Sequence, residues 1–301
     1  MRGTICSSLL AILVACGTTP RTHIGGPCDS ARQCDDGQIC DQTDPGGPVC
    51  LDVNGDLDGD GIANGKDFCE HMPGGDHDED GDGIGDECDP CPIARPPATP
   101  ESDGDGVDSP CDPDPRTPGD KIVLFNGFNA SIPSAPSEWK IQGGEAVVTP
   151  ADPTALAQLT FSLALPSNHI AILAGYRIDS VATGATGADA GVISINDLPM
   201  GGSTVQCGGS RAGSSDQLLL KTDTAPVSRP QANLFNPASL YRVAEQLTGA
   251  TANCALISDT ETGAVTTSTP GFAMNKVGLV ARGATARFSY LLVVQSGTAA
   301  Q

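Results

Sequence analysis

Acidic residues recur in three short stretches of this 301-residue chain, at a spacing that could hold a metal ion. Counted from the first ligand of each stretch, acids stand at positions 1, 3 and 5, glycine at 6 and aspartate at 12. The third stretch departs from the first two, with Glu101 at position 1 and Ser109 at position 9. The expected ligands are Asp56, Asp58, Asp60, Ile62, Asn64 and Asp67; Asp78, Asp80, Asp82, Ile84, Asp86 and Asp89; and Glu101, Asp103, Asp105, Val107 and Asp112.

Calcium is the ion that suits this spacing. It takes roughly six to eight oxygen ligands, and alternate side chains converge on one point only where glycine at position 6 lets the chain turn sharply. Position 7 then offers its carbonyl oxygen, and position 12 closes the shell. Without metal, carboxylates held about 4 Å apart repel by about 1 kcal/mol per pair even in water. We therefore predict several bound Ca²⁺ ions and loops whose folding depends on them.

Two other interpretations of this stretch are weaker. A solvated acidic linker would not keep aspartate in register with glycine and cysteine three times. Zinc binding or redox chemistry at Cys88 and Cys91 is the other interpretation. The segment around these cysteines lacks the strand-helix setting of a redox motif, and free thiols do not suit an oxidising compartment.

The charge of the chain is concentrated in the same region. The formal net charge is -21, and residues 52–114 contain 20 acids against 2 bases, whereas residues 115–301 contain 12 acids and 11 bases. A chain so acidic is excluded as a general nucleic-acid binder that works through phosphate contacts. Residues 119 to about 297 are the only part long and apolar enough for a sizeable core.

The N-terminus has the features of an export signal. Arg2 precedes an apolar run from Ile5 to Ala15, which is too short to span a bilayer. The run closes on Leu13-Val14-Ala15-Cys16, which resembles the bacterial lipobox. The resemblance implies a signal peptide over 1–16, a lipid on Cys16, and a membrane-anchored protein of the cell envelope, at the outer membrane or cell surface. The alternative is an ordinary secretory signal with an incidental cysteine.

The other cysteines suit an exported protein. Cys6 leaves with the signal, and ten remain, an even number that predicts disulfides within three segments. They are Cys28, Cys34, Cys40, Cys50, Cys69, Cys88, Cys91, Cys111, Cys207 and Cys254. Residues 17–27 read as a linker and 28–51 as a four-cysteine module with almost no apolar side chains, which we interpret as a structural spacer.

The acidic loops lack the flanking helices of an EF-hand, because no helical apolar period occurs between residues 52 and 118. The motif Asp78-x-Asp80-x-Asp82-Gly83-x-Gly85-Asp86-x-Cys88-Asp89 strongly resembles thrombospondin type 3 repeats. The resemblance assigns residues 52–118 to calcium-binding repeats and implies disulfides from Cys69 to Cys88 and from Cys91 to Cys111. The family's Asn-Pro after Cys-Pro is missing here.

Residues 119–301 alternate apolar and polar side chains between Gly, Pro, Asn and Asp, which predicts a mainly β chain with a C-terminal β-sandwich. We expect Cys207 and Cys254 to tie a loop to a strand. Ten strands are expected, at 122–125, 146–149, 156–165, 170–178, 191–195, 217–221, 241–247, 253–257, 277–281 and 288–294.

The ends of this domain resemble concanavalin A/laminin G-type jelly rolls. The resemblance is carried by Trp139-Lys140-Ile141-Gln142-Gly143-Gly144-Glu145-Ala146-Val147-Val148, by Gly278-Leu279-Val280-Ala281-Arg282-Gly283, and by Ala286-Arg287-Phe288-Ser289-Tyr290. That family includes sugar-binding and adhesive domains as well as glycoside hydrolases, so the fold alone does not choose between them.

No catalytic residue can be assigned from the sequence. A glycosidase needs two carboxylates about 5 to 10 Å apart, and the glutamates Glu138, Glu145, Glu245 and Glu261 do not form the E-x-D-x-E arrangement of jelly-roll hydrolases. A pair assembled from separate strands stays open. Serine-nucleophile and phosphate-binding glycine motifs are absent from the sequence. His169 reads as a turn or edge residue.

Two glycine-rich stretches, 184–187 and 201–213, read as flexible rim loops. With Trp139, they are where we expect a ligand. The favoured hypothesis is a non-enzymatic calcium-binding surface lipoprotein whose calcium-loaded stalk presents a recognition domain for adhesion or glycan binding. The alternatives are a surface glycan-active hydrolase and a structural envelope protein without a ligand.

Overall fold

The computed structural model describes residues 24–29, 33–74, 77–95, 102–197, 202–223, 225–257 and 262–297. These residues form sixteen β-strands and no helix, which confirms the predicted mainly β fold class. Within the same ranges, nothing has the form of a long apolar helix that could cross a membrane. The expected signal peptide and Cys16 lie outside the described residues. The chain divides into two compact units between residues 76 and 77.

In the first unit, a two-stranded antiparallel sheet pairs β1 (Gln38–Asp41) with β2 (Val49–Asp52). Two disulfides, Cys28–Cys40 and Cys34–Cys50, join the segment before β1 to β1 and to β2, and their cysteines cluster as the buried centre of this module. The four-cysteine module therefore closes within itself as predicted, with a connectivity that the spacing had left open. Disulfides replace an apolar core here, as is usual for segments this small.

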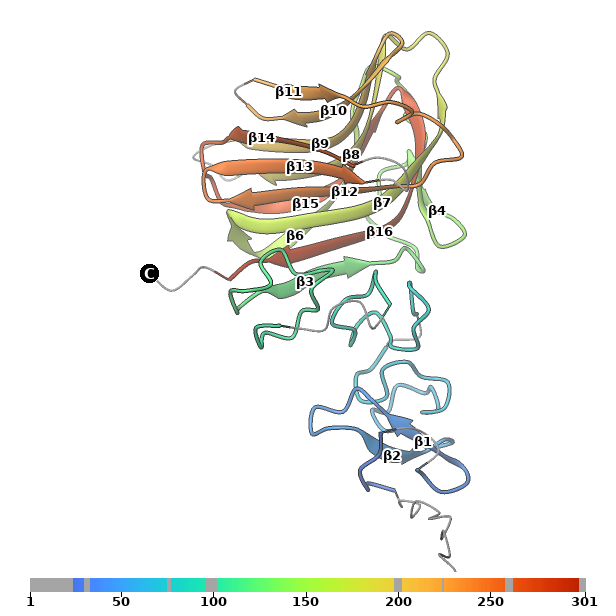
Figure 1. Ribbon diagram of the computed structural model, residues 1–301. Coiled ribbons are helices and arrows are strands. Elements are labelled where there is room, and N and C mark those ends of the chain that lie inside the picture. Colours follow the sequence, from blue (N-terminus) through green and yellow to red (C-terminus); the bar gives the residue numbers. More distant parts are fainter. Residues whose placement is uncertain are drawn as a thin grey trace, which may run out of the picture. The chain divides into compact units, whose positions relative to one another are not determined.

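The second unit contains a β-sandwich of the jelly-roll kind, shown in Figure 1. Its six-stranded sheet has the order β11 (Val227–Pro230), β10 (Ser215–Lys221), β9 (Ser203–Ala212), β8 (Gly187–Asn196), β15 (Met274–Arg282) and β6 (Ala157–Ser167). The eight-stranded sheet has the order β14 (Thr262–Ser268), β13 (Thr251–Ile257), β12 (Tyr241–Thr248), β7 (His169–Val181), β16 (Ala284–Gln295), β5 (Ala146–Val148) and β4 (Trp139–Ile141), with β3 (Lys121–Asn126) also paired to β16.

Period-two alternation builds the core between these sheets. Along β12, Tyr241, Val243 and Leu247 are buried, while Arg242 and Thr248 are exposed. Successive side chains of a strand point to opposite faces, so the apolar set of each strand meets that of the facing sheet. All ten predicted strands occur at or near the expected positions.

One glycine-rich segment differs from the sequence prediction. Residues 203–212, expected to belong to a flexible rim loop, form β9 between β8 and β10. Gly209 is needed for packing rather than flexibility, because a Cβ there would lie 3.0 Å from the hydroxyl oxygen of Tyr176, to which its N–H donates a 3.2 Å hydrogen bond. The Cys207–Cys254 disulfide consequently joins strand β9 to strand β13, one from each sheet, and not a loop to a strand.

The second and third acidic loops pack on the outer face of the eight-stranded sheet. The Cys91–Cys111 disulfide, Ile93 and Val107 form one buried cluster with the outward-facing Leu292 and Val294 of β16. The end of β16 is therefore apolar on both faces, because one face meets the sandwich core and the other meets the loops. In Figure 1 this loop segment lies beside β3 and β16. The division between the units falls inside the predicted repeat region 52–118, whose boundaries stay predictions.

Candidate metal centres

All three acidic loops share one backbone conformation. The glycine at position 6 has a left-handed backbone in each loop, with φ of 96° at Gly61, 99° at Gly83 and 88° at Gly106. A side chain would strain this conformation, which is why glycine is required. The sharp turn brings neighbouring carboxylates to one point. Carboxylate oxygens lie within 4.8 Å of one another in three groups: Asp56, Asp58 and Asp60; Asp78, Asp80 and Asp82; and Asp103, Asp105 and Asp112.

Backbone N–H groups orient the carboxylates of the loops. The first-position carboxylate of loop 1, on Asp56, accepts hydrogen bonds from Gly59 (2.8 Å) and Gly61 (3.1 Å). Asp78 makes the equivalent bonds in loop 2, from Gly81 (2.6 Å) and Gly83 (2.8 Å). The third loop's expected first ligand, Glu101, lies outside the described residues.

The position 12 aspartates are buried in all three loops. Asp67 is 6% exposed and Asp112 is 7% exposed. In every loop, one oxygen of this aspartate accepts the N–H two residues later, at 2.9 Å from Cys69, 2.7 Å from Cys91 and 2.7 Å from Asp114. The second oxygens of Asp67 and Asp112 are buried without a hydrogen-bond partner.

Burial shifts the pKa values of these carboxyls upwards. Desolvation, and then the charges of Asp58 and Asp60, raise the pKa of Asp67 above its ordinary value. Desolvation is also the main cause that raises the pKa of Asp89 to about 7, helped by the charges of Asp82 and Asp80. The position 12 carboxylates of these two loops therefore face the other acids of their own loop, and without a cation they resist ionisation.

The donor set fits Ca²⁺. Only oxygen atoms converge, as a hard cation requires, and several oxygens have no other partner. Buried unpartnered oxygens occur on Asp58, Asp67, Asp80, Asp82 and Asp112. An uncompensated buried carboxylate is costly, and a divalent cation would supply the missing interaction for several of them at once.

The ninth-position residues have a role that the spacing does not reveal. In loop 1, Asn64 accepts the N–H of Leu57 (2.9 Å) and donates to the carbonyl of Asp52 (2.9 Å). In loop 2, Asp86 accepts the N–H of Glu79 (2.8 Å) and pairs with His77 (2.7 Å). Both side chains thus brace position 2 of their own loop. The seventh-position residues Ile62, Ile84 and Val107 donate their N–H groups to the position 5 carboxylate.

The cysteines beside the loops are oxidised. Cys91 pairs with Cys111, as the family resemblance implied, and Cys69 and Cys88 are also disulfide-bonded. Because Cys88 and Cys91 are both in disulfides, neither offers a thiolate for zinc or redox chemistry.

A further group of potential metal ligands, outside the three loops and missed by the sequence analysis, lies in the first unit. Asp41, Asp44 and His71 converge there, with His71 Nδ1 at 3.1 Å from Asp41 Oδ2. His71 Nε2 lies 2.7 Å from the carbonyl oxygen of Thr43. These contacts tie β1 to the segment that follows loop 1, and they give the group a structural role.

The tryptophan that was predicted to contact a ligand lies in the core of the sandwich. Trp139 is 4% exposed and packs 5.8 Å from the ring of Phe288 in the core, so it is not a surface contact for a ligand. His169 was predicted to be a turn or edge residue; it begins β7, which lies between β12 and β16, so it stands at a strand end and not at a sheet edge, with Nδ1 at 2.8 Å from Asn168 Oδ1.

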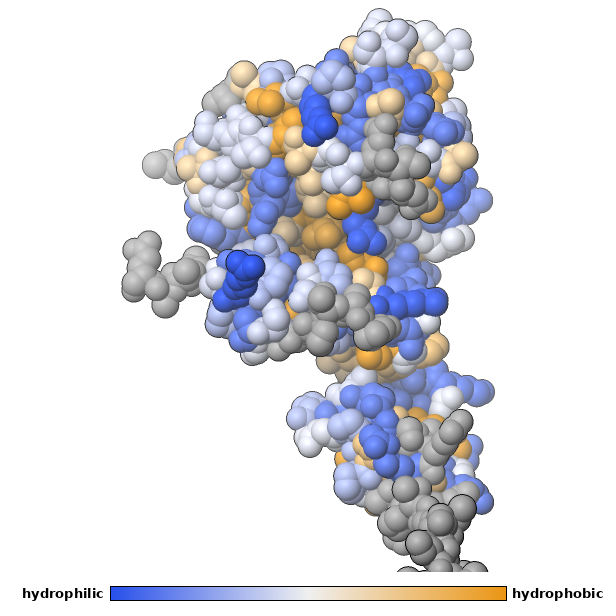
Figure 2. Space-filling view, viewed as in Figure 1, coloured by the Kyte–Doolittle hydropathy of each residue, from blue (hydrophilic) through white to orange (hydrophobic). Residues whose placement is uncertain are grey.

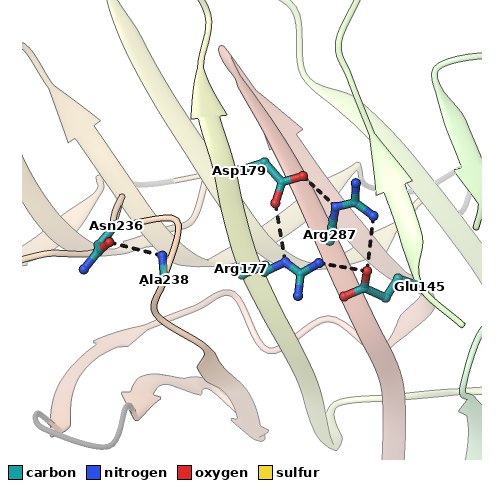
Figure 3. A network of polar contacts seen from close by, with 6 residues as sticks. All are labelled: Glu145, Arg177, Asp179, Asn236, Ala238 and Arg287. Atoms are coloured by element: carbon teal, nitrogen blue, oxygen red, sulfur yellow. Dashed lines mark hydrogen bonds and ion pairs between the residues drawn. The ribbon is translucent and has the colours of Figure 1, made fainter. Parts of the chain in front are cut away.

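The glutamates of the sandwich have separate environments. Glu145 belongs to a closed ring of ion pairs with Arg177, Asp179 and Arg287, shown in Figure 3. Glu245 is fully buried between the sheets, hydrogen-bonded by the hydroxyl of Ser194, and desolvation raises its pKa to about 8. Glu138 accepts the N–H of Ala151 at 3.1 Å, and Glu261 lies outside the described residues.

Several open depressions occur on the described part of the sandwich, and two of them differ clearly in polarity. One, of about 350 Å³, lies on the outer face of the eight-stranded sheet and includes the exposed Leu240 and Ile257. Figure 2 shows apolar side chains gathered on this face. The other, of about 580 Å³, is polar and is lined by Arg211, Asp216 and Asn236 among others. In it, the guanidinium of Arg211 lies 4.6 Å from the ring centre of Phe235.

Comparison with protein-family models finds no match, and comparison with curated proteins finds none either. Among solved structures, the CBM2 module of the evolved Dit of Lactobacillus casei BL23 phage J-1 is 11% identical, covering 60% of this chain and 98% of that one, with a TM-score of 0.41. A mutant of the GH43 protein BlXynB from Bacillus licheniformis is 10% identical, covering 57% and 39%, with a TM-score of 0.41.

The GlcNAcα1-4Gal-releasing endo-β-galactosidase from Clostridium perfringens is 10% identical, covering 61% of this chain and 64% of that one, with a TM-score of 0.41. This chain therefore spans less than two thirds of either enzyme. Likeness at this level assigns neither a ligand nor an activity to the chain.

Proposed function

We propose that the three acidic loops bind Ca²⁺ in an exported, lipid-anchored surface protein. The observation that carries the proposal is the pair of buried, unpartnered oxygens on Asp67 and Asp112. Asp112 converges with Asp103 and Asp105, and Asp67 is subject to the charges of Asp58 and Asp60. A solvated linker would leave such oxygens in water. Calcium neutralises the converging charges and offers the missing interaction.

Calcium also acts on the sandwich under this proposal. The second and third loops present Ile93, Val107 and the Cys91–Cys111 disulfide to the outer face of β16. A loop that unfolds without metal would release this apolar cluster. Bound ions therefore stabilise the loop segment that packs on β16. We assign this segment to the predicted stalk.

The sandwich is the recognition domain in this proposal, for an extracellular glycan or protein ligand in adhesion. Its polar depression supports the assignment, because polar side chains line it, among them Asn236 and the Arg211–Asp216 ion pair, whose nitrogen and oxygen lie 2.6 Å apart. Sugar hydroxyls both donate and accept hydrogen bonds, so a lining of mixed donors and acceptors suits them. Lipid on Cys16 and an address in the cell envelope remain part of the proposal.

Calorimetric titration with Ca²⁺ of the chain that begins after residue 16 tests the metal sites. We expect three or more ions, and a thermal transition that moves down in chelator. Asp58→Asn and Asp80→Asn should each remove one site, whereas Asp152→Asn, an exposed change in the sandwich, should remove none. Absence of binding would reduce the acidic segment to a linker and end the proposal.

A glycan panel tests the recognition domain. Binding without release of new reducing ends is the expected result for an adhesive domain. Turnover would replace adhesion with glycan hydrolysis. Arg211→Ala should weaken binding at the polar depression, and Arg229→Ala, which removes the same charge on β11, serves as its control.

A further inference from the structure

Asp120 lies directly before β3, eight residues beyond the last ligand expected in the third loop. Its side chain is 3% exposed. One carboxylate oxygen accepts the backbone N–H of Gly297 at 2.7 Å, and the other is buried without a hydrogen-bond partner. A buried carboxylate in this condition needs a proton or a cation at its second oxygen.

Two contacts join Asp120 to the third loop. Asp105 Oδ2 accepts the N–H groups of Asp120 (2.7 Å) and Gly119 (3.0 Å). The carboxyl of Asp112 also lies in contact with the carboxyl of Asp120. Each of the two carboxyls has one oxygen bound to a backbone N–H and one without a partner.

We infer that Asp120 is a ligand of the third metal site, with Asp103, Asp105 and Asp112, and that calcium there fastens the end of β16 to the start of β3. The inference rests on the proposed calcium binding and adds a ligand from outside the repeat. One cation bound by both Asp112 and Asp120 satisfies the two orphan oxygens and removes the repulsion between them.

The site then holds together the chain before β3 and the chain after β16 at one corner of the sandwich. Asp120 carries the connection, because its metal-facing carboxylate also binds the N–H of Gly297. Gly297 in turn lies so close to the chain before β3 that a Cβ on it would be 2.8 Å from the carbonyl oxygen of Pro118. Calcium in the loop is thereby linked to the order of the last residues of β16.

Asp120→Asn in the full chain tests this role. Asparagine keeps an oxygen for the N–H of Gly297 and removes only the charge. In Ca²⁺, the variant should lose one bound ion or bind it at least 10-fold more weakly, and its melting temperature should fall below that of the wild type. In chelator the order should reverse or vanish, because the variant no longer repels Asp112.

Hydrogen exchange at the Gly297 amide gives a second readout. Calcium should slow exchange in the wild type and not in Asp120→Asn. Asp114→Asn is the matched control, since Asp114 is exposed and nearby and loses the same charge. It should retain the wild-type ion count and the calcium-dependent protection.

The possible failures are distinguishable. If the wild type binds ions and Asp120→Asn binds the same number with the same affinity, Asp120 is not a ligand and the proposed calcium function stands. If the variant is destabilised equally with and without calcium, Asp120 is only an acceptor for Gly297, and the inference is wrong. If the wild type binds no ion, the proposed function fails first.

Discussion

The acidic loops and the sandwich core both bury carboxyl groups, and the two regions differ in what accompanies them. Asp112 is buried beside other carboxyls, with one oxygen unpartnered and a pKa raised to about 7. Glu245 also has one unpartnered oxygen, but it is buried away from other carboxyls, with its other oxygen bonded to the Ser194 hydroxyl and its pKa raised by desolvation to about 8. Several converging charges call for a divalent cation, whereas a single isolated carboxyl can be neutralised by one proton.

The comparison separates two kinds of solution dependence. The loops should respond to calcium, and pH should act mainly on the sandwich core once saturating calcium holds the loop carboxyls ionised. Experiments that change calcium or pH separately can therefore distinguish the two regions.

Calcium removal should have the largest effect. Each site held at 100 times its Kd stabilises the folded loops by about 2.7 kcal/mol, so three sites contribute about 8 kcal/mol. Chelator should expose residues 77–118 to proteolysis at much lower temperature. Trp139, the only tryptophan in the sequence, lies in the sandwich core, so its fluorescence reports that region separately. Equal protease cutting with and without calcium would contradict the prediction.

Removal of the Cys207–Cys254 disulfide should have the next largest effect, confined to the sandwich. The bridge spans 47 residues, for which chain entropy gives about 4 kcal/mol. A double Cys→Ala variant, unfolded by urea and followed by Trp139 fluorescence in saturating calcium, should lose stability by that amount. Its calcium affinity should be unchanged. A loss of calcium affinity would show that the stability of the sandwich and calcium binding by the acidic loops are coupled.

Glu245→Gln should alter the pH dependence of the sandwich. The pKa of Glu245 is raised by folding, so its stabilising contribution is complete below the unfolded value near 4.5 and is lost as pH rises towards 8. The wild type should lose about 3 kcal/mol between pH 5 and pH 8 in saturating calcium. The variant should lose much less. Glu138→Gln, on a partly exposed side chain, should follow the wild type, and identical profiles for all three proteins would refute the assignment.

The ion-pair ring at the surface should give the smallest effect. Arg287 and Arg177, opposite each other on neighbouring strands, share Glu145 and Asp179 (Figure 3). Because the ring is partly solvated, Arg287→Gln should cost about 0.5 to 1 kcal/mol, and less at high salt. Urea unfolding at low and high sodium chloride measures this. A loss that does not change with salt would point to packing of the arginine stem instead.

The sequence pattern was sufficient for most strands because half-buried strands alternate visibly. It was insufficient at β9, where Gly208 and Gly209 removed the alternation and read as a loop. Without side chains, these glycines leave room for the facing Tyr176 and the neighbouring Gly191, both distant in sequence. Packing partners of this kind leave no local pattern.

The convergence of the acidic side chains was predictable for the opposite reason. Asp78, Asp80 and Asp82 are brought together by one turn, so their spacing alone indicates their convergence. The internal bonds of Asn64 and the approach of Asp120 were not predictable, because they depend on the folded path of the chain. Burial of Trp139 was missed because a lone tryptophan suits a core as well as a binding surface.

The corner where β3 begins also decides how the sandwich would carry a mechanical load from an anchored N-terminus. The chain enters at Gly119, and the first residue of β3, Lys121, pairs with Gln295 at the end of β16. A pull away from the sheet would open this antiparallel pair one step at a time, which is a weak way to resist force. The bonds from Asp105 to Asp120 and from Asp120 to Gly297 stand ahead of that first pair. A pull from the N-terminal side would thus reach the bonds of the third loop before it reaches any strand of the sandwich.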